Sequence, residues 1–316
     1  MNWPNDEDTI AQCGSIAALL EVSGYPKPGN IHRTRDFPKT RYEHFLASSV
    51  AIIPTLREIA YYGRSAYNNK FGLNELNLGA SILKAVKNTQ FWQYGGNTNL
   101  GIILLFVPLA CAAGMLIDHP HPSIQLFREN LELIIKNSTN EDTIKLYDAI
   151  RLANPGGLGT VNKFDLKNTS PKALKKENIN LYDIFKISSV RDNIAKEWIT
   201  QFQITFEKGY PFFLDVFHIT EDINISTIYT YLKILGDIPD TLISRKYGVE
   251  LAERISNKAK QILKASLKEG FSTKYSIELV WNFDLELRNK KKINPGTSAD
   301  LTAAAIMVAL LKGMRF

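Results

Sequence analysis

Apolar residues recur three and four positions apart along most of the chain, a spacing that places them on one face of an α-helix. Alternating apolar and polar runs of the kind that form strands are scarce. The helical spacing predicts helices over residues 8–22, 42–62, 73–87, 123–136, 141–153, 181–206, 225–235, 249–268 and 298–311. We therefore expect an all-α fold.

Two of the predicted helices are apolar on every side, residues 100–117 and residues 301–311. A helix without a polar face belongs in a protein core or in lipid. The second run is too short to span a bilayer. The first contains Pro108 and lacks flanking clusters of Lys, Arg or aromatic residues. We predict that both are central helices of the core, and a membrane-associated helical protein is the alternative.

One long segment, residues 154–180, breaks the helical pattern and is rich in Gly, Asn, Lys and Pro. Loops of this length within compact domains are often functional. The chain shows neither an internal repeat nor a low-complexity linker. We therefore expect residues 1–316 to form a single compact multi-helix domain, in which residues 154–180 are a long loop and a candidate lid.

The composition is that of a soluble globular protein, with 45% apolar and 22% charged residues among 316. The formal net charge is +6, and its basic clusters are short and lack a motif that docks on nucleic acid. We expect no nucleic-acid partner. The two cysteines, Cys13 and Cys111, form neither a disulfide framework nor a metal pair, which is typical of a cytoplasmic protein.

Two Gly-containing turns that lead into the apolar helices are candidate anion-binding sites, and they are residues 95–98 and residues 294–300. Backbone N–H groups and the helix dipole at such N-termini favour an anion. Ordinary capping is the alternative, by Asn97 or Thr98 in the first turn and by Thr297 with Asp300 in the second. For either turn alone we favour capping.

Further polar clusters lie at residues 21–38, 189–193 and 237–246. Charged pairs of this kind are most often surface ion pairs. The chain has no G-x-S-x-G, no H-E-x-x-H and no phosphate-binding P-loop motif. The residues alone indicate a helical protein that binds an anionic ligand.

Taken in order, these polar segments resemble the motifs of triphosphoribosyl-dephospho-CoA synthases, especially the archaeal branch of that family. The segments are KPGN-x-HR, GGNTNLG, AIRLANPGGLG, VRDNIA, PDTLISRKYG and NPGTSADLTAA. The resemblance implies an all-α transferase whose substrates are ATP and dephospho-CoA. In characterised bacterial members the 5-triphosphoribosyl group of ATP passes to the ribose 2′-hydroxyl of dephospho-CoA, and adenine is released.

The resemblance also implies the residues of the site. Those implied to bind substrate or phosphate are Lys27, Gly29, Asn97, Thr98, Gly101, Arg191, Thr241, Arg245, Gly296, Thr297 and Ser298. Asp240 and Asp300 are candidates for binding Mg²⁺ or for stabilising positive charge on the ribose, and Asp192 is a candidate base. Mg²⁺ is expected as the companion of the triphosphate.

Two motifs depart from the family pattern. Asn99 and Leu100 stand where the bacterial motif has His and Lys, and Asp192-Asn193 replaces its Gly-Glu. These differences leave the acceptor open, so that a related glycosyl transfer to another cofactor precursor is one alternative. A non-catalytic nucleotide-binding protein is another. The sequence does not choose between a monomer and a homodimer.

Overall fold

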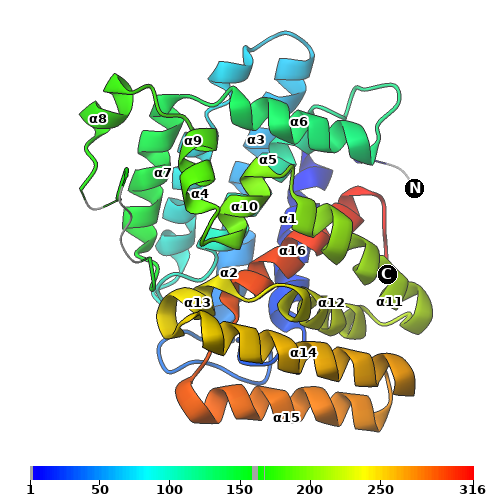
Figure 1. Cartoon of the computed structure of the whole chain (residues 1–316). Coiled ribbons are helices and arrows are strands. Elements are labelled where there is room, and N and C mark those ends of the chain that lie inside the picture. The colour runs from blue at the N-terminus through cyan, green and yellow to red at the C-terminus, as the bar shows by residue number, and fades with distance from the viewer. Residues whose placement is uncertain (1–2, 159–162, 167) are drawn as a thin grey trace.

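Every regular element in the described part of the chain is a helix (Figure 1). The computed structural model describes residues 3–158, 163–166 and 168–316, except the side chains of residues 290 and 291. The helices are α1 (Glu7–Ser23), α2 (Tyr42–Ala51), α3 (Ile53–Tyr67), η1 (Leu73–Glu75), α4 (Leu78–Trp92), α5 (Leu100–Gly114), α6 (Ile124–Lys136), α7 (Asn140–Ala153), α8 (Pro171–Lys176), α9 (Leu181–Ser188), α10 (Asn193–Ile199), the π-helical turn η2 (Thr205–Gly209), α11 (Tyr210–Thr220), α12 (Ile223–Asp237), α13 (Thr241–Tyr247), α14 (Val249–Glu269), α15 (Lys274–Lys291) and α16 (Gly296–Leu311). The predicted all-α class is confirmed.

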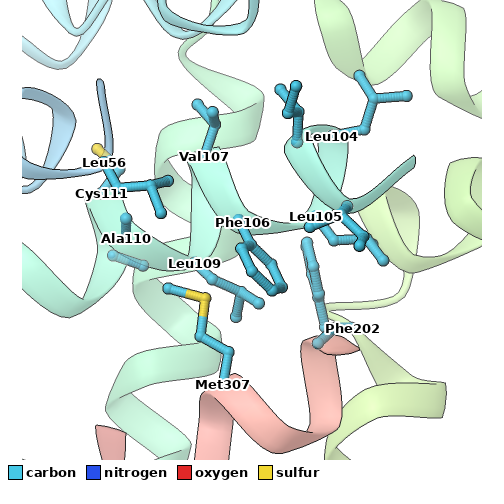
Figure 2. Close-up of a cluster of buried hydrophobic side chains, with 14 of the residues drawn as sticks. Leu56, Leu104, Leu105, Phe106, Val107, Leu109, Ala110, Cys111, Phe202 and Met307 are labelled. Carbon is cyan, nitrogen blue, oxygen red and sulfur yellow. The ribbon is translucent and has the colours of Figure 1, made fainter. Parts of the chain in front are cut away.

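The two apolar helices, α5 and α16, lie at the centre of the fold and contact each other. Figure 2 shows Phe106 of α5 beside Met307 of α16 in the shared core. Helix α3 packs closely on α5 because both helices carry glycine at their crossing. A Cβ on Gly63 would lie 2.0 Å from the carbonyl oxygen of Cys111. The prediction of buried central helices is therefore correct.

Pro108 explains how α5 can contain a proline and remain in the core. Proline has no N–H, so the carbonyl of Leu104, four residues earlier, loses its helical partner. The indole Nε1 of Trp198 donates a hydrogen bond to that carbonyl at 3.1 Å. A side chain from α10 thus satisfies the backbone group that the proline leaves open. None of the helices described here is long and apolar enough to cross a membrane.

A second, smaller core lies between α12, α14 and α15, on the side of the molecule where α15 is outermost (Figure 1). Tyr229 of α12 packs against Phe271 with ring centroids 4.6 Å apart. The Tyr231 hydroxyl donates a hydrogen bond to the carbonyl oxygen of Pro28 at 2.6 Å. This core therefore supports residues 27–32, which lead towards the candidate site.

Three predicted helices are each divided in the structure. Residues 42–62 form α2 and α3, which meet at Ile52, and Pro54 lies in the first turn of α3. Residues 73–87 contain the short turn η1 and then α4, separated by Asn77 in the left-handed conformation. Residues 181–206 divide at Asp192, whose side chain caps α10.

Four helices were not predicted. Helices α11, α13 and α15 lie where the apolar spacing did not indicate a helix, and α8 occupies Pro171–Lys176 within the segment predicted as one loop. The remainder of the predicted loop is correspondingly shorter. Residues 159–162 and 167 of that segment lie outside the described residues.

Candidate active site

A cavity of about 410 Å³ opens where the N-termini of α5 and α16 meet. The turn before α5 contributes Asn97 and Thr98 to its lining, and the start of α16 contributes Thr297. The remaining walls come from α1, the end of α7 with the turn at residues 154–158, helices α9 and α10, and α13. The cavity therefore brings together segments that are up to 279 residues apart, from Glu21 to Asp300.

Most of the predicted site residues line this cavity. They are Asn97, Thr98, Gly101, Arg191, Asp192, Arg245, Gly296, Thr297 and Asp300. The others lie directly behind the lining and support it: Lys27, Gly29, Asp240, Thr241 and Ser298. The lining also contains apolar side chains, among them Leu104, Leu146 and Phe185.

Asp300 lies against the first turn of α5 because residue 101 is a glycine. A Cβ on Gly101 would lie 2.0 Å from Oδ2 of Asp300. Across the described part of the chain, no group donates a hydrogen bond to this carboxylate. Removal from bulk water raises the pKa of Asp300 well above its usual value. Nearby charges act on it as well: Glu21, Asp240 and Asp192 raise the pKa further, and Lys27 lowers it.

Asp240 has a different environment from Asp300. Its Oδ1 accepts hydrogen bonds from the backbone N–H groups of Leu242 and Ile243, at 2.9 and 3.1 Å, and so caps α13. Its Oδ2 accepts from the backbone N–H and the hydroxyl of Ser298, at 2.8 and 2.9 Å. Both oxygens are occupied, and Asp240 does not line the cavity. The residue ties α13 to the start of α16.

Of the two candidates for binding Mg²⁺, Asp240 and Asp300, only Asp300 lines the cavity. Among the residues that the structure describes, no three His, Cys, Asp or Glu side chains are grouped so that they could hold a metal ion. The assignment of Mg²⁺ ligands therefore stays a prediction.

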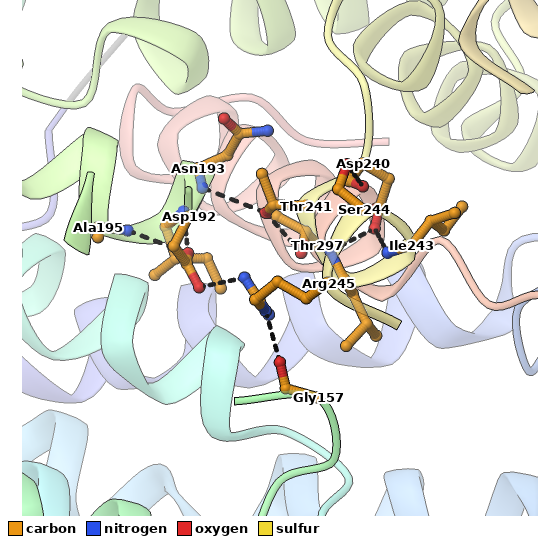
Figure 3. Close-up of polar contacts among 12 residues, drawn as sticks. Gly157, Asp192, Asn193, Ala195, Asp240, Thr241, Ile243, Ser244, Arg245 and Thr297 are labelled. Atoms are coloured by element: carbon orange, nitrogen blue, oxygen red, sulfur yellow. Dashed lines mark hydrogen bonds and ion pairs between the residues drawn. The ribbon is translucent and has the colours of Figure 1, made fainter. Parts of the chain in front are cut away.

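Asp192 and Arg245 form an ion pair on the cavity wall (Figure 3). Oδ2 of Asp192 lies 2.5 Å from an Nη of Arg245, and Oδ1 caps α10 by accepting from the N–H of Ile194 at 2.8 Å. The Nε of Arg245 donates to the carbonyl of Gly157 at 3.0 Å. One arginine thus joins α13 to α10 and to the turn at residues 154–158. Both oxygens of the predicted base are engaged.

Lys27 is fully buried and does not reach the cavity. Its ammonium group donates hydrogen bonds to the carboxylate of Glu21 and, at 2.8 Å, to the carbonyl of the same residue. Burial lowers the pKa of Lys27, and the neighbouring Glu21 raises it. Burial raises the pKa of Glu21, and Lys27 lowers it. Glu21, which the sequence analysis did not include among the site residues, is the member of the pair that lines the cavity.

Gly29 has a positive φ of 74°, a conformation that favours glycine. A Cβ here would lie only 2.4 Å from the carbonyl oxygen of Ile293. Its N–H donates to Oδ1 of the buried Asp284 at 2.8 Å. The glycine of the Lys-Pro-Gly segment is therefore needed for close packing against α15 rather than for direct contact with a ligand.

Of the two capping candidates before α5, Asn97 caps a backbone N–H and Thr98 contacts a side chain instead. Oδ1 of Asn97 accepts a hydrogen bond from the N–H of Leu100 at 3.1 Å, as a capping side chain does. The hydroxyl of Thr98 lies 2.7 Å from that of Ser48. Both residues also line the cavity, so capping and ligand contact are compatible here.

The family model for ATP:dephospho-CoA triphosphoribosyl transferases matches residues 7–315. The chain belongs to this family. The chain is also similar to a crystal structure from Archaeoglobus fulgidus, and that protein is assigned as a triphosphoribosyl-dephospho-CoA synthase. The two share 27% sequence identity with a TM-score of 0.61, over 85% of this chain and 100% of the other. A comparison with curated proteins gave no match.

These findings confirm the predicted family and its enzyme class. Each of the six sequence segments through which the transferase family was predicted contributes to the cavity or lies next to its lining. The segment around Leu152–Leu158, for which the sequence analysis named no site residue, contributes Asn154, Pro155 and Gly156. Asn30 and Asn294 were also missed; they line the cavity and are joined by a hydrogen bond of 2.8 Å.

Proposed function

We propose that this protein transfers the 5-triphosphoribosyl group of ATP to the ribose 2′-hydroxyl of dephospho-CoA and releases adenine, and that it does so in the cavity between α5 and α16. The observation that carries the proposal is the family match over residues 7–315, together with the convergence of the family's motif residues on one cavity.

The chemistry needs stabilisation of positive charge on the sugar. The acceptor oxygen bonds to C1′ of the ATP ribose as the bond from C1′ to adenine N9 breaks, and the electron pair of that bond leaves with adenine. Positive charge builds up on the ribose during this step, and a carboxylate beside it lowers the barrier. Asp300 is suited to this role because its carboxylate faces the cavity and accepts no hydrogen bond from the described residues. Burial raises its pKa, and the positive charge that develops on the ribose acts in the opposite direction and favours the ionised carboxylate.

The triphosphate needs positive charge and N–H donors. We assign this role to Arg191 and Arg245 and to the N-termini of α5 and α16, all of which line the same cavity. Mg²⁺ is the usual companion of a triphosphate, and phosphate oxygens can supply its ligands. Both oxygens of Asp240 accept hydrogen bonds from the protein, so a Mg²⁺ ion bound with the triphosphate would take its ligands from the phosphates rather than from Asp240.

The test is adenine release from ATP and Mg²⁺, measured by chromatography with and without dephospho-CoA, and the mass of the coupled product. We expect release that depends on dephospho-CoA and a product carrying the triphosphoribosyl group. Arg245→Ala should weaken ATP binding. Arg254→Ala, which removes an exposed arginine of α14 remote from this cavity, is the matched control. Tight ATP binding without adenine release would favour the non-catalytic nucleotide-binding alternative.

A second candidate is the same transfer to a different cofactor precursor. The observation that favours it is Leu100, an apolar residue in the cavity lining at the position where the bacterial motif has Lys. An acceptor held there gains no cation from this residue. Adenine release that occurs without dephospho-CoA but rises with another nucleotide-like acceptor would support this candidate.

Assembly and location remain proposals. A homodimer stays a prediction that light scattering would test. A cytoplasmic location also stays a prediction, and it is supported by the two cysteines, which are both buried and free.

A further inference from the structure

Glu21 is the carboxylate in the cavity that no motif-based role covers. It lies near the end of α1, is 2% exposed and contributes to the cavity lining. Its Oε1 accepts a hydrogen bond from Lys27. Its Oε2 accepts none from the residues that the structure describes. A buried carboxylate thus has one oxygen fixed by the protein and the other available at the cavity.

Lys27 fixes Glu21 and has no second acidic partner in contact. Among the described residues, its hydrogen bonds both go to Glu21, one to the carboxylate and one to the backbone carbonyl. Charges on neighbouring helices also act on this pair. Asp300 of α16 raises the pKa of Lys27, and Arg288 of α15 lowers it. Asp192 and Asp240 in turn raise the pKa of Asp300. Lys27 therefore contacts Glu21 alone, and its charge also lowers the pKa of Asp300, which faces the same cavity.

With Asp300 assigned to the positive charge on the ribose, the two remaining candidate bases, Asp192 and Asp240, are occupied. Asp192 uses Oδ2 for its ion pair with Arg245 and Oδ1 for capping α10. Asp240 accepts four hydrogen bonds and lies outside the lining. A general base must reach the proton that it removes, so an oxygen that faces the cavity and is free of protein donors is the first requirement.

We propose that Glu21 is a catalytic residue of the transfer, whose Oε2 accepts the proton of the attacking hydroxyl while Lys27 holds Oε1 in place. The inference rests on the function proposed above. The hydroxyl proton moves to Oε2 as the oxygen bonds to C1′, the C1′–N9 bond breaks, and its electron pair leaves on adenine. One proton leaves the hydroxyl and departing adenine takes up one, so the reaction needs no further reactant. Lys27 is a positioning residue.

Three variants test the assignment. Glu21→Gln keeps the size of the side chain and removes the proton acceptor. The double variant Glu21→Ala with Lys27→Met removes both charges, so that neither is left buried alone. Asp192→Asn is the matched control, because asparagine also caps a helix and only the carboxylate charge is lost.

We expect Glu21→Gln to lower kcat for adenine release by about 10²- to 10⁴-fold, the usual contribution of general acid–base catalysis, with a small change in the KM for ATP. Added formate should restore part of the turnover of the folded double variant by occupying the vacated carboxylate position. Formate should not raise the rate of Asp192→Asn. Circular dichroism establishes that each variant is folded.

The outcomes separate this inference from the proposed function. An active wild-type protein together with a Glu21→Gln variant of equal kcat would overturn the role of Glu21 and leave the function standing. A folded double variant that formate does not restore would also overturn it. If the wild-type protein released no adenine with any acceptor, the proposed function would fail and the assignment of Glu21 would fail with it.

Discussion

Replacing Gly101 by alanine tests whether the Asp300 carboxylate must lie against α5. The new Cβ would lie 2.0 Å from Oδ2 of Asp300 and 2.8 Å from Cδ1 of Ile194. Non-bonded atoms approach to about 3.5 Å. The carboxylate would therefore have to move by roughly 1.5 Å to restore that separation. Residue 101 and Asp300 both line the cavity, so the movement occurs where the ribose is proposed to react.

The expected effect on activity is much larger than the effect on stability. Alanine is favoured over glycine within a helix by about 1 kcal/mol. Overpacking costs about 1–3 kcal/mol, so the net loss of stability is about 0–2 kcal/mol. Domains are stable by about 5–15 kcal/mol, and the folded fraction stays near complete after such a loss. A misplacement of about 1 Å in an active site can cost roughly 100-fold in rate.

The assay is kcat for adenine release, measured beside the free energy of unfolding in urea. Gly114→Ala is the control, because a Cβ at the other end of α5 would meet the carbonyl oxygen of Ala60 at 2.0 Å, away from the cavity. We expect Gly114→Ala to lose stability and keep its kcat. If Gly101→Ala keeps more than half of the wild-type kcat, or if both folded variants lose kcat equally, the rate does not depend on the position of the Asp300 carboxylate against α5.

Three further predictions concern buried charges. Lys27→Met leaves the Glu21 carboxylate buried without its partner and should lower the free energy of unfolding by about 3–5 kcal/mol, and adding Glu21→Gln should recover most of this loss in urea denaturation. Asp240→Ala should cost about 1–3 kcal/mol through the lost cap and the unsatisfied N–H groups, yet a Mg²⁺ titration of the remaining activity should give an unchanged dependence. Burial raises the pKa of Glu197 from its ordinary 4.5 to about 7, so the unfolded chain releases this proton first and stability falls as the pH rises from 4.5 to 7. By the usual conversion of a pKa shift into free energy, the free energy of unfolding falls by about 3 kcal/mol over this range, and the fall should be absent in Glu197→Gln. A difference in the free energy of unfolding between wild type and variant that stays constant from pH 4.5 to 7 would contradict this prediction.

The uniformly apolar helices could be predicted from sequence because burial on all sides leaves an unmistakable composition. Helix α15 could not, since its buried face includes Ser276 and Asp284, both fully buried, beside Val280 and Phe283. Two polar residues on the core side weaken the apolar periodicity on which the prediction depends. Pro54 did carry a signal for the break between α2 and α3, because proline is favoured in the first turn of a helix.

The sequence predicts which segments form the candidate site, but it does not predict the role of each residue in it. Asp192, Asp240 and Asp300 each lie at or near the start of a helix, α10, α13 and α16, and their environments differ only through contacts made in the fold. Asp240 is saturated by Ser298, a residue 58 positions away. Glu21 ends an amphipathic stretch and gives no local sign of its pairing with Lys27. Its position on the cavity wall depends on how α1 packs against α16.

The cavity has two sides of unequal rigidity, and this affects how such an enzyme can change substrate. The floor is formed by α5 and α16, whose side chains are almost all buried in the main core. The rim includes the exposed residues Asn154 and Lys246 and the half-exposed Ser188, and Arg245 links α13 there to α10 and to the turn at residues 154–158. Substitutions in the rim can alter the acceptor without disturbing the packing that supports bond cleavage. Divergence of acceptor specificity is therefore open to single surface substitutions, while the ribose chemistry is protected by the same contacts that keep the protein folded.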